Sequence, residues 1–316
     1  MKNILIKGAG IGGLTVAFML QQKGIPVTLS APHNSPIGTA SWYAGGMLAP
    51  YCERESAEQI VEDLGIQAIQ WWHKTFPNLV IQRGTLVVTP VRDRVELERF
   101  SARTHNHKTI NSAEIAQLEP DLAERFNCAL FYEKEAHLDP RQALVSLKEN
   151  LIKNGARFVD VDISETNFDL VIDATGIARL GQDKNIRGVR GEMLLLRSTD
   201  IKISRPVRLL HPRFPLYIVP RKGNIFMIGA TMIESNFDGT ISARSMMELL
   251  NAAYTLHPAF AEAEIVESGV GIRPSYPDNF PSVYKYGNHI SINGFYRHGF
   301  LLAPEMAKRA IKLALE

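Results

Sequence analysis

The stretch that decides the fold is KNILIKGAGIGG, residues 2–13. It joins an apolar segment to Gly8, Gly10 and Gly13, spaced G-x-G-x-x-G, ahead of a helical pattern over residues 12–22. In a dinucleotide site the first glycine permits a tight turn, the second lets backbone approach the pyrophosphate, and the third lets the helix pack on the strand. The stretch therefore predicts a strand, a phosphate-binding turn and a helix, with an ordinary glycine turn as the alternative.

The next strand, VTL at 27–29, is followed by an unusual residue for such a site. An acid about 20 positions after the glycines normally binds the ribose of NAD or FAD. Ser30 and Ala31 stand there instead, and no arginine suited to NADP occurs before Arg54. Ribose contacts are therefore expected from backbone groups or from polar side chains at Ser30, His33, Asn34 and Ser35.

Composition narrows the class of protein. The 316 residues carry a formal charge of +2 with no basic run, which disfavours a nucleic-acid or anionic membrane surface and favours a small-molecule partner. Cys52 and Cys128 form no CxxC pair and have no zinc-type histidine spacing, so we expect reduced thiols and no metal site. With no signal segment or membrane-spanning run visible, the expected location is cytoplasmic.

The pattern of apolar residues along the rest of the chain predicts alternating strands and helices near both ends and mostly strands in the middle. Asp139 is the expected N-cap of a helix that starts at Pro140 and stops at Gly155, and Pro304 is expected to begin the closing helix. Further strands are predicted at 169–176, 191–197, 216–220, 224–232 and 289–293, and further helices at 60–76, 92–100, 112–118 and 242–257.

One predicted helix carries an apolar stripe whose residues are spaced four positions apart. Ile60, Leu64, Ala68, Trp72 and Phe76 recur every fourth position, which places them along one side of a helix. We interpret the stripe as core packing.

Four later segments carry a family resemblance. GTASWYAGGMLAPYCE (38–53) resembles the segment after the second strand in the FAD-dependent D-amino acid oxidase superfamily, and is most similar to the glycine oxidases of thiamine biosynthesis. The segments LYIVPRKGNIFMIGATM (216–232), GIRPSYPDNFPSV (271–283) and NGFYRHGFLLAP (293–304) are similar to the same family in the same order. Together they span nearly the whole chain.

The resemblance implies an α/β fold with a Rossmann-like FAD-binding domain and an inserted α+β substrate domain built on a mostly antiparallel sheet. The FAD-binding domain is expected to comprise residues 1–50, 136–185 and 270–316, and the substrate domain residues 51–135 and 186–269.

The glycine loop and the resemblance together predict non-covalent FAD. Small residues at Ala44, Gly45 and Gly46 would let the backbone lie flat against the isoalloxazine ring, although a plain glycine-rich turn is the alternative. The expected cofactor contacts are Gly8, Gly10, Ile11, Gly12, Gly13, Ser30, Ala31, Ala40, Ser41, Gly45, Gly46, Met47, Val161, Ala174, Thr175, Gly176, Phe295, Tyr296, Arg297, His298, Gly299, Phe300 and Leu301.

Arg273 is the candidate substrate residue. Its apolar setting in GIRP calls for a bidentate anion, which is either the substrate carboxylate that the resemblance implies or a structural partner such as Asp278. The resemblance adds Tyr217, Met232 and Arg297 as pocket residues. No side chain is expected to act as a catalytic acid or base.

The implied chemistry is oxidation of a small amino acid, most simply glycine, by transfer of hydride from its α-carbon to the flavin. The imino acid hydrolyses to glyoxylate and ammonia, molecular oxygen gives hydrogen peroxide, and the reaction would serve thiazole formation in thiamine biosynthesis. The alternatives are a D-amino acid dehydrogenase, a sarcosine-type oxidase or a flavin-binding protein without turnover. A homo-oligomer is the family expectation.

Two departures from the family pattern fall at the adenosine end. Ala31 replaces the acid, and only DISETNF (162–168) stands where the family has a small β-meander. Both departures predict weaker or altered binding of the adenosine part of FAD.

Overall fold

Two large sheets organise the molecule, and both ends of the chain lie beside the first. The computed structural model describes residues 2–161, 163–212 and 215–316. The first sheet is parallel except at its β16–β17 edge. Its strands run in the order β16 (Ser282–Tyr286), β17 (His289–Asn293), β9 (Leu170–Asp173), β1 (Ile4–Lys7), β2 (Val27–Ser30) and β8 (Arg157–Val159).

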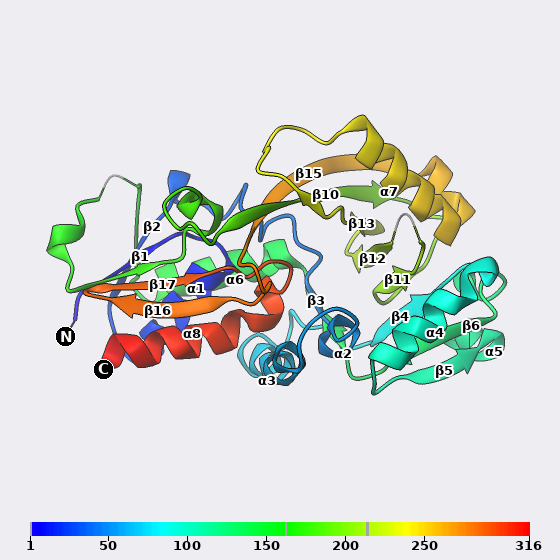
Figure 1. Ribbon diagram of the computed structural model, residues 1–316, viewed down its shortest axis with the longest axis horizontal. Coiled ribbons are helices and arrows are strands. Elements are labelled where there is room, and N and C mark those ends of the chain that lie inside the picture. Colours follow the sequence, from blue (N-terminus) through cyan, green and yellow to red (C-terminus); the bar gives the residue numbers. More distant parts are fainter. Residues whose placement is uncertain (1, 162, 213–214) are drawn as a thin grey trace.

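Four helices pack around this sheet: α1 (Ile11–Gln21), α3 (Gln59–Thr75), α6 (Pro140–Lys153) and α8 (Gly299–Leu315). Helix α1 is apolar on all sides because it lies between α6 and α8. Figure 1 shows α8 running along β16 and β17, with the two termini at the same end of the molecule. None of the helices in the described ranges has the length and apolar character needed to cross a bilayer.

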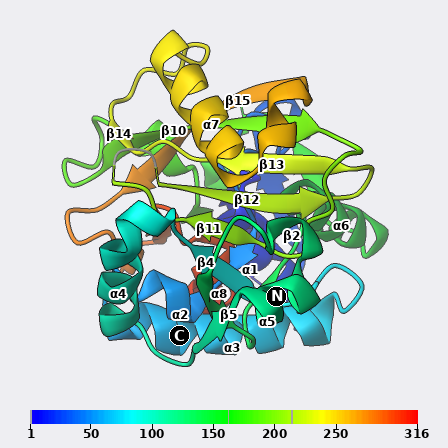
Figure 2. The ribbon, with the colours of Figure 1, turned by 90° about the vertical axis from the view of Figure 1, so that its right-hand side faces the viewer.

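The second sheet is antiparallel except where β11 meets β4. Its order is β14 (Ile233–Glu234), β10 (Arg187–Arg197), β13 (Ile225–Gly229), β12 (Leu216–Arg221), β11 (Val207–Leu209), β4 (Thr85–Val88), β6 (Cys128–Tyr132) and β5 (Lys108–Asn111), with β15 (Glu264–Ser275) paired to β10. Figure 2 shows α7 (Ala243–Leu256) lying across β12 and β13. The opposite face of β12 carries Tyr217 and Val219.

Short elements connect the two sheets. Strands β3 (Met47–Leu48) and β7 (Ala136–His137) pair with each other beside α2 (Pro50–Glu53). Helices α4 (Arg94–Arg103) and α5 (Ser112–Leu118) flank the β4–β6 end of the second sheet. Short 3-10 helices occur at Pro32–Asn34, Val91–Asp93, Pro120–Leu122, Glu165–Asn167, Gly176–Arg179 and Pro258–Glu262.

The predicted fold class is confirmed, and most predicted elements are present with ends shifted by a few residues. Asp139 caps α6 by accepting hydrogen bonds from the Arg141 and Gln142 amides, at 2.9 and 3.4 Å. In the stripe of α3, Leu64, Ala68 and Trp72 are buried as predicted. Ile60 does not belong to it, because this first-turn side chain is 39% exposed.

The predicted start of the last helix at Pro304 is wrong. Helix α8 begins at Gly299, so Pro304 lies inside it and cannot donate an amide hydrogen to the Phe300 carbonyl. The Trp72 indole nitrogen of α3 donates to that carbonyl instead, at 2.9 Å. A side chain from another helix therefore replaces the missing backbone bond.

The domain ranges remain a prediction. Their division at residue 50 assigns α3 to the substrate domain, yet Val61, Leu64, Ile69 and Trp72 pack in the core of the first sheet. This core thus extends beyond the predicted FAD-binding segments.

Candidate active site

A single cavity of about 1360 Å³ collects residues from both sheets. Its walls come from the β1–α1 loop, the segment before β3, the ends of β9 and β11, strands β12 and β15, and the turn before α8. The cavity at the junction between the two sheets is therefore the candidate active site.

The glycine loop forms one end of this cavity. A Cβ at Gly8, where φ is +104°, would lie 2.4 Å from the Ala174 carbonyl oxygen, and one at Gly13 would lie 2.0 Å from the Gly8 carbonyl oxygen. Both positions require glycine for packing within the protein. A Cβ at Gly10 would meet only Ser41 Oγ, at 3.4 Å, so the space beside Gly10 is free for a closely approaching ligand.

The N-terminus of α1 faces the same end. Its first turn carries no acidic side chain, which leaves the positive end of the helix dipole uncompensated. The Ile11 amide donates to Ser41 Oγ at 3.1 Å, which ties the loop to the segment before β3. The arrangement fits a pyrophosphate.

At the end of the cavity expected to hold adenosine, the groups that stand in the place of the usual acid are hydrogen-bonded within the protein. Ala31 lines the cavity, and its amide donates to the Val159 carbonyl at 3.2 Å. The Ser30 hydroxyl donates to the Asp160 carbonyl at 3.2 Å. Of the polar residues proposed for the ribose, Ser30, His33 and Ser35 line the cavity, whereas Asn34 is not part of its wall and its carbonyl accepts from Lys148.

The segment expected to face the flavin lies close to β12. The Tyr217 ring fits between two glycines: a Cβ at Gly45 would lie 2.7 Å from it and one at Gly229 3.0 Å. Arg221 Nη2 donates to the Gly45 carbonyl at 2.6 Å. The small residues therefore let this backbone lie directly beside Tyr217.

Arg273 is a half-buried cation of the cavity wall without an acidic partner among the described residues. It projects from β15 over Gly191 of β10, where a Cβ would lie 2.2 Å from the guanidinium. Its Nη1 donates to the Thr231 carbonyl at 3.0 Å, while Asp278 accepts the Phe280 amide instead. Burial lowers the pKa of Arg273, with Tyr217 and Tyr296 opposing the shift.

Arg297 has an acidic partner within the protein, unlike Arg273. Its Nε donates to Glu53 Oε2 at 2.8 Å and its Nη2 to Ser56 Oγ at 2.9 Å. Its Nη1 lies 3.7 Å from Met232 Sδ, which also accepts from the Tyr296 hydroxyl at 3.4 Å. Met232 is 52% exposed, so it lies at the open side of the cavity.

Glu53, at the end of α2, is a buried residue of the cavity wall that the sequence reasoning missed. Its carboxylate accepts from Arg208 and Arg297 and lies 2.9 Å from His298 Nε2. Burial opposes ionisation, but Arg297 and Arg208 hold the pKa of Glu53 well below its usual range. Only the proximity of Glu53 to the Gly-Met-Leu segment could have suggested it.

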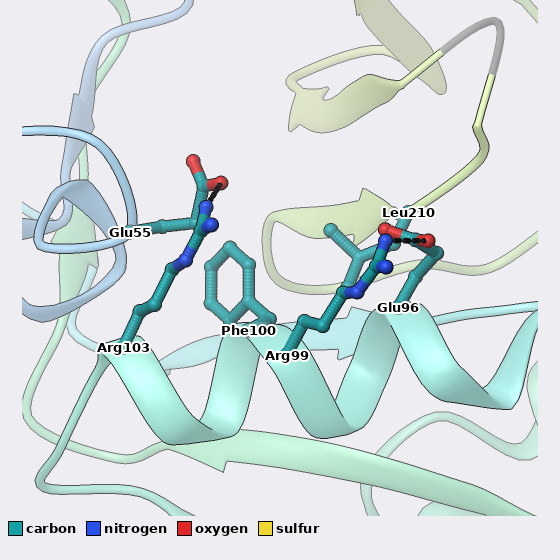
Figure 3. A pocket seen from close by; sticks show the side chains of 6 residues that line it. All are labelled: Glu55, Glu96, Arg99, Phe100, Arg103 and Leu210. Carbon is teal, nitrogen blue, oxygen red and sulfur yellow. Dashed lines mark hydrogen bonds and ion pairs between the residues drawn. The ribbon is translucent and has the colours of Figure 1, made fainter.

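A polar recess of about 380 Å³ adjoins the cavity (Figure 3). Arg103 reaches Glu55 at 3.4 Å and Arg99 reaches Glu96 at 2.9 Å. The two glutamates, together with Phe100 and Leu210, also line the main cavity. The recess is therefore the outer, charged part of the same site.

The structure brings the sequence-predicted site residues together, apart from Gly13, which packs beneath Gly8. The substrate candidates Tyr217, Met232, Arg273 and Arg297 line the cavity. The cofactor candidates that line it are Gly8, Gly10, Ile11, Gly12, Ser30, Ala31, Ala40, Ser41, Gly45, Gly46, Met47, Val161, Ala174, Thr175, Gly176, Phe295, Tyr296, Arg297, His298, Gly299, Phe300 and Leu301.

A phosphate-binding glycine loop, a long cavity and a second sheet over it define a dinucleotide-dependent enzyme of two parts. The chain belongs to the family described as FAD dependent oxidoreductase (DAO), whose sequence profile matches residues 3–313. The resemblance seen in the four segments is thereby confirmed, as is FAD as the cofactor.

Relatives match over nearly the full chain. The "Putative thiamine biosynthesis oxidoreductase ThiO" of Rhizobium etli is 55% identical over 307 residues, covering 96% of this chain and 94% of that protein. The glycine oxidase of Geobacillus kaustophilus is 25% identical over 347 residues, covering 96% and 90%.

Solved structures agree on the fold. The crystal structure of glycine oxidase from Geobacillus kaustophilus gives a TM-score of 0.81 at 22% identity and covers 100% of this chain and 95% of that one. The crystal structure of iminodiacetate oxidase from Chelativorans gives 0.83 at 20% identity and covers 99% and 95%. At such identities the likeness concerns the fold alone.

Proposed function

We propose that this FAD-dependent oxidoreductase is an oxidase of a small amino acid, with glycine as the substrate and glyoxylate, ammonia and hydrogen peroxide as the products. The observation that carries the proposal is Arg273, a half-buried cation in the cavity wall with no carboxylate partner among the described residues. A substrate carboxylate would supply the missing anion. The names of the glycine oxidases among the relatives support the choice of glycine.

The residues around Arg273 support binding and orientation. FAD, when bound, supplies the acceptor for the hydride of the substrate. The Arg273 guanidinium presents a planar fork to the carboxylate, and Tyr217 sets one wall of the pocket. Arg297, fixed by Glu53, adds positive charge near the open side of the cavity. A carboxylate fixed in this way orients the α-carbon, which is the main contribution the protein makes.

The positions of the two cysteines support non-covalent binding of FAD. Both cysteines are free, and neither Cys52 nor Cys128 belongs to the described cavity wall. A sarcosine-type oxidase with a cysteine-linked flavin is therefore the weaker alternative. Denaturing the protein should release all flavin into the supernatant, and flavin retained by the chain would contradict this part of the proposal.

Turnover separates the remaining alternatives. We expect the purified yellow protein to release peroxide with glycine, and to do so less efficiently with sarcosine and D-alanine. Reduction of an artificial dye without peroxide would identify a dehydrogenase instead of an oxidase. A flavin-containing protein inactive with all three amines and both acceptors would be a binding protein without turnover.

We also propose that the product supplies thiazole formation in thiamine biosynthesis, as the name of the Rhizobium etli relative suggests. Expression of the chain in a bacterium that lacks its own glycine-oxidising step should restore growth without thiazole. An Arg273→Ala variant serves as the control, and growth restored equally by that variant would contradict the proposal.

A further inference from the structure

A second layer of buried charge lies behind Glu53. It consists of the fully buried Glu135, in the turn between β6 and β7, and of Arg208 of β11, whose side chain is 12% exposed. Arg208 donates to Glu53 Oε1 and is close enough to Glu135 to affect the ionisation of that carboxyl group. Arg208 reaches the cavity, whereas Glu135 is fully buried and does not line it.

Glu135 is fixed firmly at this place. Its Oε1 accepts the Cys52 amide at 2.7 Å, one residue before Glu53. Its own amide donates to the Tyr132 carbonyl at 3.2 Å, and its carbonyl accepts the Gly84 amide at 3.1 Å. The side chain therefore stands directly behind the residue pair that ends α2.

Two buried atoms in this layer lack hydrogen-bond partners. They are Glu135 Oε2 and Arg208 Nε, an acceptor and a donor that belong to oppositely charged groups, and the Thr85 hydroxyl beside Glu135 also lacks a hydrogen-bond partner of good geometry and opposes the rise of the Glu135 pKa. Such atoms are costly to leave unpaired in a low-dielectric interior.

We propose that Arg208 is shared between Glu53 and Glu135, and that the ionisation of Glu135 determines how firmly Glu53 holds Arg297 and His298 in the cavity wall. When Glu135 is neutral, Glu53 is the nearest anion for Arg208. When Glu135 is ionised, it draws Arg208 toward itself, so more of the Glu53 charge is available to Arg297 and His298. Glu135 is then a positioning residue, and this role rests on the function proposed above.

The surroundings place this ionisation near neutral pH. Burial raises the pKa of Glu135 to about 7, and Arg208 opposes the shift. The titratable groups that face Glu135 from the neighbouring elements are Tyr51 and Cys52 of α2, Tyr132 of β6 and Arg208 of β11. Burial raises the pKa values of Tyr51, Cys52 and Tyr132, so these groups stay neutral there.

The test compares Glu135→Gln with a matched control, Glu133→Gln. Glu133 lies two positions earlier in the same turn, but is exposed and pairs with Lys108 at 2.7 Å. The visible absorption of the bound flavin is titrated without substrate from about pH 5.5 to about pH 8.5. We expect a transition near pH 7 in the wild type and in Glu133→Gln, and none in Glu135→Gln.

Turnover supplies the second readout. The ratio of kcat/KM for glycine between Glu135→Gln and the wild type should be near unity at low pH and fall about fivefold above pH 8, because the variant cannot gain the ionised state. A ratio that is constant with pH, or a flavin transition that survives in Glu135→Gln, would overturn the proposal. If the wild type does not oxidise glycine at all, the proposed function fails, and the flavin titration still tests the network.

Arg208→Lys provides a second route if Glu135→Gln does not fold. Lysine keeps the charge but cannot bridge two carboxylates as a guanidinium does. Glu135 is then stabilised less in its ionised form, so the flavin transition should move to higher pH. An unmoved transition would contradict the sharing of Arg208.

Discussion

At the scale of single residues, Arg273 makes the sharpest prediction. Replacing it with alanine removes the half-buried cation proposed for the substrate carboxylate, and breaking a buried charge pair costs about 3 to 5 kcal/mol. The expected loss in kcat/KM for glycine is about 10² to 10³-fold. Steady-state peroxide release measures it, and flavin content confirms that the cofactor remains.

Arg273→Lys is the matched variant. It retains the charge, but it loses the planar fork and the fit over Gly191, so it should recover little of the activity. Near-normal efficiency in Arg273→Ala would show that the carboxylate binds elsewhere. Full recovery in Arg273→Lys would show that charge alone is sufficient.

What the sequence reveals at this scale depends on how local the signal is. The spacing of Gly8, Gly10 and Gly13 is itself the motif, so the loop could be predicted. Glu53 and Arg208 stand 155 positions apart, and no local pattern links them. The need for glycine at position 191 is likewise invisible until β10 and β15 pair and Arg273 covers it.

At the scale of elements, the contact between α3 and α8 predicts a measurable contribution to stability. The Trp72 indole donates to the Phe300 carbonyl that Pro304 leaves without its helical partner. Trp72→Phe should therefore cost about 1 to 3 kcal/mol in the free energy of unfolding beyond the packing change, because a buried carbonyl is left unsatisfied. Urea unfolding measures the cost.

A double-mutant cycle isolates this hydrogen bond. Pro304→Ala restores an amide that can donate to Phe300, so Trp72→Phe should cost less in that background. Trp71→Phe, the neighbouring half-buried tryptophan on α3, is the control for ring size. Equal costs of Trp72→Phe in both backgrounds would show that the indole matters only by packing.

The same contact explains why one helix boundary could not be predicted. Proline is typical of the first turn of a helix, and that rule places the start of α8 at Pro304. The rule fails here because Trp72, more than 200 positions earlier, satisfies the carbonyl that proline leaves open. The strands were predicted less completely, because the apolar runs of β4 and β6 are short and β15 is half-exposed, and pairing with distant strands defines them.

At the scale of the whole molecule, the junction between the two sheets holds two buried groups whose pKa values are shifted in opposite directions. Burial raises the pKa of Glu135 to about 7 and lowers the pKa of His137 to about 3, with Arg221 adding to the latter shift. In the unfolded chain the pKa values of the two groups are about 4.3 for Glu135 and about 6.5 for His137. Between about pH 4.5 and about pH 6.5, the folded state holds the Glu135 proton while the unfolded state holds the His137 proton.

The two contributions therefore oppose each other in this window, and single variants should separate them. His137 lowers stability as pH falls below about 6.5, whereas Glu135 lowers stability as pH rises through about 7, each by at most about 1.4 kcal/mol per pH unit. In Glu135→Gln the free energy of unfolding should fall more steeply as the pH is lowered, because only the His137 contribution remains. In His137→Phe the free energy of unfolding should instead rise as the pH is lowered through this window. Urea unfolding at several pH values gives the slopes. Parallel slopes in the wild type and both variants would place the pH dependence outside this junction.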